Sequence, residues 1–114
     1  MSILLITHDL GVIAEMADHV AIMYAGRIVE SAGAKQLFAE PRHPYTQGLL
    51  KCLPHLEIDQ AKLKVIKGQV PDLIDLPPGC SFQPRCQFAE EKCSREFPPL
   101  REVAEGHRVA CLLK

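Results

Sequence analysis

Four cysteines in a proline-containing C-terminal segment constrain this chain more than any other feature. They follow the spacing C-x5-C-x6-C-x17-C and are Cys80, Cys86, Cys93 and Cys111. The segment around them has little hydrophobic periodicity, so burial of apolar side chains is not expected to be sufficient to fold it. Thiolates that converge on one inorganic centre would hold such a segment together. We call these residues the four-cysteine set.

The chemistry of sulfur ligands allows more than one kind of metal centre at the four-cysteine set. Thiolate is a soft ligand that selects zinc or an iron–sulfur cluster over hard cations, and four cysteines match the ligand count of a 4Fe–4S cluster. Structural zinc sites use close C-x2–4-C pairs, whereas no pair here is that close, and the wider gaps favour the larger cluster. Two disulfides or four separate thiols are the alternatives. The fifth cysteine, Cys52, follows an apolar helical pattern and is expected to pack as a small hydrophobe.

Size and charge exclude several classes of protein. A chain of 114 residues makes one domain at most, or part of one. Thirteen Lys and Arg against 14 Asp and Glu give a net charge of −1, which provides no basic field for nucleic acid. No apolar run is long enough to cross a bilayer, and the first residues do not form a secretion signal. We therefore expect a cytosolic chain in a reducing compartment, where clustered thiols more often bind a metal than form disulfides.

The N-terminal part begins with a pattern of strand, loop and helix. Residues 3–6 are a continuous apolar run, typical of a strand that is covered on both faces. Apolar residues then recur at helical spacing from Leu10 to Val20, and Thr7 or Asp9 is placed to cap that helix. His8 lies between the two elements. Ligands of open α/β sheets bind at this end of a strand, which makes His8 a candidate contact for an anion.

The middle of the chain predicts a hairpin followed by short helices. Residues 20–24 and 27–30 are β-rich and are separated by Gly26, which favours a hairpin. Residues 34–39 suit a short helix, and Pro44 can open another that carries Leu49, Leu50 and Leu53 on an apolar face. Residues 63–67 are the last strand-like run, and a boundary is expected within residues 56–62. The fold class is accordingly α/β.

Two groups of segments carry a family resemblance. The first group is LLITHDL (4–10) and ADHVAIMYAGRIVE (17–30). The second group is HPYT (43–46), PGCSFQPRC (78–86) and HRVAC (107–111). Together these segments span essentially the whole chain and resemble the ATP-binding subunits of ATP-binding cassette (ABC) transporters of the oligopeptide and dipeptide import branch. The first group looks like the end of the nucleotide-binding domain, and the second is similar to the C-terminal extension found in that branch.

This resemblance implies a fold, a function and a set of partners. Residues 1–55 would be the C-terminal remnant of a P-loop NTPase core, and residues 56–114 a small, loop-rich extension that carries the four-cysteine set. His8 matches the switch histidine, which contacts the terminal phosphate of ATP and helps to organise the attacking water. The intact subunit would bind ATP and Mg and hydrolyse ATP on the cytoplasmic face of the membrane, beside permease subunits and a second ATP-binding subunit. The family's extension can carry a 4Fe–4S cluster on four cysteines, with zinc as the alternative.

The sequence lacks other parts that phosphoryl transfer requires. It contains no G-x-x-x-x-G-K-[ST] loop, no signature sequence and no apolar strand that ends in Asp-Glu for magnesium. We therefore interpret it as a C-terminal fragment that hydrolyses no ATP alone. Residues 3–6 would leave an open strand edge, which predicts self-association. The alternative function is a stand-alone four-cysteine metal-binding interaction module without nucleotide chemistry.

Overall fold

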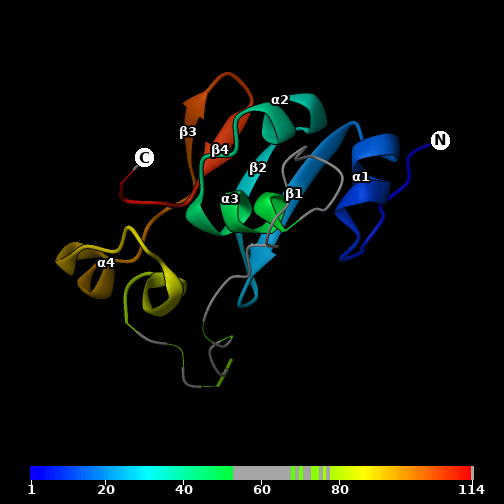
Figure 1. The fold of residues 1–114 in the computed structure, drawn as a ribbon. Helices are drawn as coiled ribbons and strands as arrows, with labels where there is room; N and C mark the ends of the chain where they lie inside the picture. The colour runs from blue at the N-terminus through cyan, green and yellow to red at the C-terminus, as the bar shows by residue number, and fades with distance from the viewer. Residues whose placement is uncertain (53–67, 69, 71–72, 75, 77, 114) are drawn as a thin grey trace.

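The fold combines short helices with one four-stranded antiparallel sheet (Figure 1). A computed structural model describes residues 1–52, 68, 70, 73–74, 76 and 78–113. The helices are α1 (Leu10–Met16), α2 (Ala34–Ala39), α3 (Pro44–Lys51), the 3-10 turn η1 (Gln83–Arg85) and α4 (Glu91–Arg95). The strands are β1 (His19–Tyr24), β2 (Arg27–Gly33), β3 (Arg101–Ala104) and β4 (His107–Val109). This confirms a mixed α/β chain.

Strands β1 and β2 form the predicted hairpin. They pair antiparallel, with Tyr24 opposite Arg27 across a two-residue turn. Both turn residues have positive φ, 50° at Ala25 and 79° at Gly26, which is the backbone of the tight turns that suit the twist of a hairpin. Gly26 adopts this conformation without steric cost, so the turn chemistry seen in the sequence fixes the register.

The C-terminal hairpin extends the same sheet, and the sequence did not predict it. The strand order is β1-β2-β4-β3, with β4 antiparallel to both β2 and β3. Strands of four and three residues are too short to produce a clear alternation, which explains why this hairpin was missed. The predicted loop-rich extension therefore contributes two strands to the sheet that the N-terminal hairpin begins.

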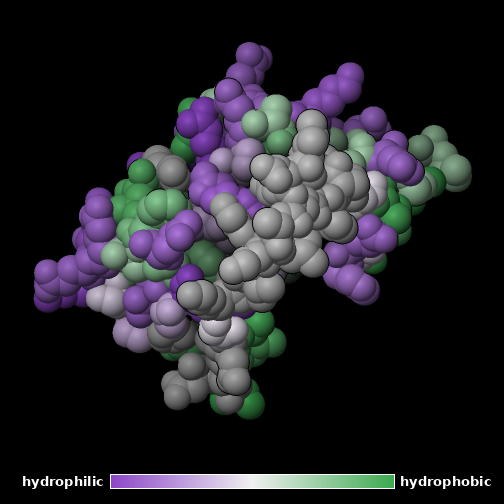
Figure 2. Space-filling view, viewed as in Figure 1, coloured by the Kyte–Doolittle hydropathy of each residue, from purple (hydrophilic) through white to green (hydrophobic). Residues whose placement is uncertain are grey.

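The prediction of a strand at residues 3–6 is wrong. The described chain is irregular there, and its side chains lie in solvent, with Ile3 76% and Leu4 and Ile6 each 89% exposed. A strand needs a neighbour for its backbone hydrogen bonds, and none of the described strands lies beside this segment. Figure 2 shows apolar atoms at the end of the molecule from which the N-terminus emerges.

Helix α1 begins where predicted but is shorter than its apolar spacing indicates. The Asp9 carboxylate accepts hydrogen bonds from the backbone N–H groups of Gly11 and Val12 at 3.0 and 3.3 Å, which confirms it as the cap. The helix ends at Met16, and Val20 is a buried residue of β1 instead of the last helical position.

The remaining helices agree with the sequence analysis. Helix α2 has the predicted bounds, and α3 opens at Pro44 with Leu50 buried. The expected Leu53, the strand-like run at 63–67 and the boundary within 56–62 lie outside the described residues. None of the helices in the described part of the chain is long and apolar enough to span a membrane.

The core lies between the sheet and helices α1, α2 and α3. Apolar residues of the first hairpin alternate inward and are joined by side chains from the helices and by one from the cysteine-bearing segment. The buried core residues are Leu10, Val20, Ile22, Tyr24, Val29, Ala32, Ala34, Leu37, Leu50 and Phe82. Phe82 lies between Cys80 and Cys86 in sequence, so that segment is attached to the core by an aromatic side chain.

Candidate metal centre

The four cysteines come from separate local structures in the C-terminal half. Cys80 and Cys86 flank the turn η1, Cys93 lies in α4, and Cys111 follows β4 by two residues. Cys93 and Cys111 are buried, whereas Cys80 and Cys86 are partly buried. All four are free thiols, which is the state that a metal centre requires and which does not match the disulfide alternative.

Electrostatic interactions link the members of the four-cysteine set. Burial raises the pKa of the Cys80 thiol, and negative charge on Cys111 and Cys93 raises it further. Burial likewise raises the pKa of Cys86, with smaller contributions from Cys111, Cys80 and Cys93. These contributions indicate that the four sulfurs lie in the same part of the fold.

Backbone amides point at the sulfurs. N–H groups of Phe82 and Gln83 donate to the Cys80 sulfur, and the N–H of Phe88 donates to that of Cys86. These bonds lower the two pKa values, although burial outweighs them. The Glu90 N–H lies 3.5 Å from Cys93 Sγ in the same manner. Amide donors stabilise thiolate over thiol, so the donors around three of the four sulfurs suit a bound metal.

A glycine allows Cys80 to lie against Cys93. The backbone N–H of Cys80 donates to the Cys93 carbonyl oxygen at 2.8 Å. Gly79 before it has φ +76°, and a Cβ there would overlap the Cys93 carbonyl oxygen and lie 2.8 Å from the carbonyl carbon of Ser94. Only glycine permits this approach without displacing backbone, so Gly79 fixes the distance between two of the four segments.

An aromatic cluster anchors the loop between Cys80 and Cys86. The Phe82 ring contacts Tyr24 and Tyr45 at centroid distances of 5.2 and 5.4 Å and His43 at 5.7 Å. The Arg85 guanidinium donates to the Tyr24 hydroxyl at 3.3 Å. Burial raises the pKa of the Tyr45 phenol, while Arg85 partly offsets this. The cluster therefore joins the first two cysteine positions to β1 and α3.

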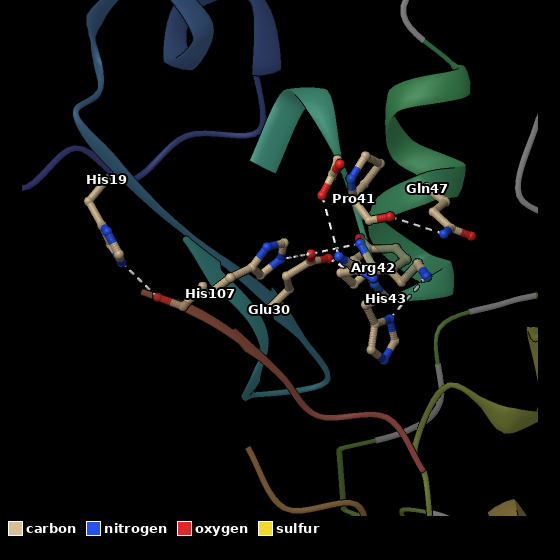
Figure 3. A network of polar contacts seen from close by, with 10 residues as sticks. His19, Glu30, Pro41, Arg42, His43, Gln47 and His107 are labelled. Atoms are coloured by element: carbon tan, nitrogen blue, oxygen red, sulfur yellow. Dashed lines mark hydrogen bonds and ion pairs between the residues drawn. The ribbon is translucent and has the colours of Figure 1, made fainter. Parts of the chain in front are cut away.

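A second polar network ties the C-terminal hairpin to β2, and the sequence analysis missed it. Figure 3 shows the Glu30 side chain between His107 of β4 and the backbone at Arg42 and His43. Glu30 Oε1 lies 2.6 Å from His107 Nε2, and both side chains are fully buried. The signal in the sequence was weak: a glutamate at an inward position of a strand, with its partner 77 residues away.

Two basic side chains of α4, Lys92 and Arg95, form ion pairs with glutamates. Lys92 Nζ lies 3.7 Å from Glu90, and Arg95 pairs with Glu91 on the exposed face of α4. Both cations are therefore paired with glutamates at the start of α4.

The described residues contain no group of three or more His, Cys, Asp or Glu side chains placed to bind a single metal ion. The four-cysteine set is thus a neighbourhood of thiols with amide donors, held by Phe82 and by β4. The other predicted site residue, His8, lies exposed on the surface just before α1. Its assignment as a phosphate contact stays a prediction.

Comparison with known proteins identifies the class. The chain is 52% identical over 112 residues to the oligopeptide transport ATP-binding protein AppD of Bacillus subtilis. The aligned region covers 98% of this chain and 34% of AppD. It is 46% identical over 114 residues to the dipeptide transport ATP-binding protein DppD of Bacillus subtilis, covering all of this chain and 34% of that protein. A peptide import ATP-binding protein of Brucella ovis is 51% identical to this chain over 118 residues. That alignment covers 98% of this chain and 35% of the Brucella protein. The chain spans about a third of the length of these relatives.

These relatives are ATP-binding proteins of peptide transport, and this class agrees with the resemblance seen in the sequence. The family described as oligopeptide/dipeptide transporter, C-terminal region, matches residues 29–93. The match begins within β2 and ends within α4, and it includes Phe82 and three residues of the four-cysteine set. The chain belongs to this family.

We predict that Gly79→Ala destabilises the chain more than the same change at Gly106. Both glycines have positive φ, which costs alanine about 1–2 kcal/mol, but a Cβ at Gly106 meets nothing within 4 Å. Overlap with Cys93 should add about 1–3 kcal/mol at Gly79. Urea unfolding followed by circular dichroism measures both free energies. Equal losses would show that the close approach of Cys80 and Cys93 is unimportant.

Proposed function

We propose that this chain is the C-terminal part of an ATP-hydrolysing subunit that energises peptide import through an ABC transporter. The observation that carries the proposal is the family match over residues 29–93 together with about 50% identity to peptide transport ATP-binding proteins over nearly the whole chain. In this function residues 1–55 end a P-loop NTPase core and residues 56–114 form the extension. The subunit would lie on the cytoplasmic face of the membrane, beside permease subunits and a second ATP-binding subunit.

His8 would be the residue of this chain that acts on ATP. In the proposed subunit its imidazole hydrogen-bonds the terminal phosphate and helps to hold the attacking water, while Mg and the phosphate-binding loop come from sequence that this chain lacks. Its exposed position before the capped helix α1 is compatible with contact to a ligand. Phosphoryl transfer depends on positioning and charge neutralisation, so this histidine alone cannot catalyse it.

A chimaera tests this function. We expect replacement of the matching third of the Bacillus subtilis protein AppD by this chain to restore oligopeptide uptake and ATP hydrolysis in a strain that lacks AppD. His8→Ala in the chimaera should abolish both activities, whereas His19→Ala, at an exposed histidine bonded to Ser31, should leave them near the parent level. The separate 114-residue chain should hydrolyse no ATP.

Two results would contradict this proposal. Uptake by the chimaera that survives His8→Ala would remove His8 from the mechanism. A stable chimaera that transports nothing, combined with metal binding by the chain, would favour the alternative of a stand-alone metal-binding interaction module.

We further propose that the four-cysteine set holds a 4Fe–4S cluster, with zinc as the alternative. The support is the gathering of four free thiols, the amide donors to Cys80, Cys86 and Cys93, and the wide spacing of the ligands in sequence. A bound cluster would supply a covalent cross-link among η1, α4 and β4. Its principal effect would be to stabilise the extension, since metal binding to thiolates is coupled to folding.

We expect anaerobic incubation with iron and sulfide to give a chain that retains both elements after gel filtration and has sulfur-to-iron absorption. Serine at any member of the four-cysteine set should sharply reduce the retained iron, because each thiolate is one ligand. Cys52→Ser is the matched control and should retain the full amount of iron, because the Cys52 thiol, at the C-cap of α3, donates a hydrogen bond to the Gly48 carbonyl oxygen. Retention of zinc alone would establish the alternative metal, and retention of neither would refute the centre.

The exposed N-terminal segment should make the 114-residue chain self-associate. Met1, Ile3, Leu4 and Ile6 form an apolar segment that can be buried against a second copy. Light scattering should give a mass above the monomer value of 12.7 kDa, and the double change Leu4→Lys and Ile6→Lys should shift it towards that value. Leu73→Lys, at another exposed leucine, should not. A wild-type chain that is monomeric at all concentrations would contradict this.

A further inference from the structure

The position of Cys111 depends on a short contact between strands. Strand β4 has only two register pairs with β2, Glu30 with Val109 and Ser31 with Arg108. The backbone N–H of Ala110 adds one hydrogen bond to the Val29 carbonyl at 2.8 Å, and Cys111 follows directly. So few backbone bonds are a weak attachment for a buried side chain, which makes the side chains at this junction important.

Glu30 is the centre of that junction. Its carboxylate accepts three hydrogen bonds, from the Arg42 N–H at 2.8 Å, the His43 N–H at 3.0 Å and the His107 imidazole at 2.6 Å (Figure 3). A carboxylate only accepts hydrogen bonds, and three donors compensate it for the loss of water. The backbone N–H groups of the α2–α3 connection thus hold the Glu30 carboxylate in place, and the carboxylate in turn holds His107 of β4.

His107 depends on this contact for its orientation. Its side chain is fully buried, and Nδ1 has no partner in the part of the chain that the structure describes. The Nε2 contact with Glu30 is therefore the polar interaction that directs the ring. The pair is diagonal across the antiparallel register, since Glu30 lies opposite Val109, which is two residues from His107.

We propose that Glu30 is a positioning residue for Cys111 and acts on it through His107. Strand β4 carries His107 at its first residue and passes directly into Cys111, so fixing the ring also fixes the backbone that delivers the fourth sulfur. The Arg101 guanidinium, 3.4 Å from the Cys111 carbonyl oxygen, holds that backbone from β3. As a role in assembling the metal centre, this inference rests on the proposed four-cysteine site.

This role differs from general stabilisation of the fold. Cys80, Cys86 and Cys93 are held by the aromatic cluster, Gly79 and α4, none of which has a described bond to His107. The aromatic cluster is linked to Glu30 by the His43 backbone N–H, which is separate from the Glu30–His107 contact. Loss of the Glu30–His107 contact should consequently loosen β4 and Cys111 while the other three cysteines keep their environment. Glutamine at position 30 is a suitable change, because it keeps the shape but turns one acceptor into a donor that faces another N–H group.

The test measures alkylation at each cysteine in the full chain, stripped of metal by a chelator under reducing conditions. Iodoacetamide labelling is followed by mass spectrometry of the cysteine peptides. Glu30→Gln and His107→Gln should each speed labelling of Cys111 about tenfold relative to Cys93, since a buried thiol reacts only when its segment opens. Glu102→Gln is the matched control: its carboxylate accepts from Gly106 in the exposed turn of the same hairpin, and labelling should be unchanged.

The double variant Glu30→Gln with His107→Gln separates a shared route from two independent effects. If Glu30 acts through His107, the double variant labels no faster at Cys111 than the faster single variant. After iron and sulfide loading, Glu30→Gln should also lose iron to a ferrous chelator faster than wild type, and Glu102→Gln should not.

Two labelling results would overturn the positioning role. These are equal acceleration at all four cysteines, which indicates global opening, and no acceleration at Cys111. A wild-type chain that retains neither iron nor zinc refutes the proposed centre, and with it the role of Glu30 in assembling one. The two failures are distinguishable, because labelling needs no metal.

Discussion

The pairing of β2 with β4 is the constraint on which the rest of the structure depends. It joins residues near position 30 to residues near position 109 and turns two hairpins into one sheet. Closing so long a loop costs conformational entropy. The few backbone hydrogen bonds between two short strands contribute too little free energy to offset that cost alone. The buried Glu30 carboxylate supplies the additional attachment, because it binds His107 from β4 and backbone amides from the α2–α3 connection at once.

A second attachment lies at the other end of the cysteine-bearing segment. Phe82 enters the core among Tyr24, Tyr45 and His43, and Arg85 reaches the Tyr24 hydroxyl. The segment that carries three of the cysteines is thus held at Phe82, and the fourth cysteine is held at the end of β4. Apolar burial at Phe82 and the hydrogen bonds of Glu30 thus attach to one fold four thiols that the sequence separates by up to 31 positions.

Local sequence signals were sufficient for the local parts of this fold. The turn at Ala25 and Gly26, the cap at Asp9 and the opening of α3 at Pro44 each depend on a few adjacent residues, and the structure has them as predicted. Residues 3–6 have the composition of a strand, but a strand forms only with a neighbour, so composition alone misled. The β3–β4 hairpin was missed because its strands are too short to show an alternation. The Glu30–His107 pair was missed because its partners lie 77 residues apart in the chain. The cysteines are candidates from the sequence because thiol chemistry is visible without knowledge of the fold, and their role as ligands stays a prediction.

Opposing electrostatic effects act on the sulfurs of the proposed centre. Burial raises the pKa of Cys80 and Cys86, and negative charge on neighbouring sulfurs raises it further, while backbone amides act in the opposite direction. At Cys80 and Cys86 burial is the largest effect, and the amide donors do not outweigh it. Charged thiolates at these positions would also repel one another. A cation at the centre reverses the sign of the interaction, since each sulfur is then attracted to the metal instead of repelled by its neighbours. The extension therefore places amide donors at the sulfurs, and in the proposed centre charge compensation would come from the metal. By linkage, a bound metal would in turn stabilise the two attachments, at Phe82 and at Glu30, that deliver the sulfurs.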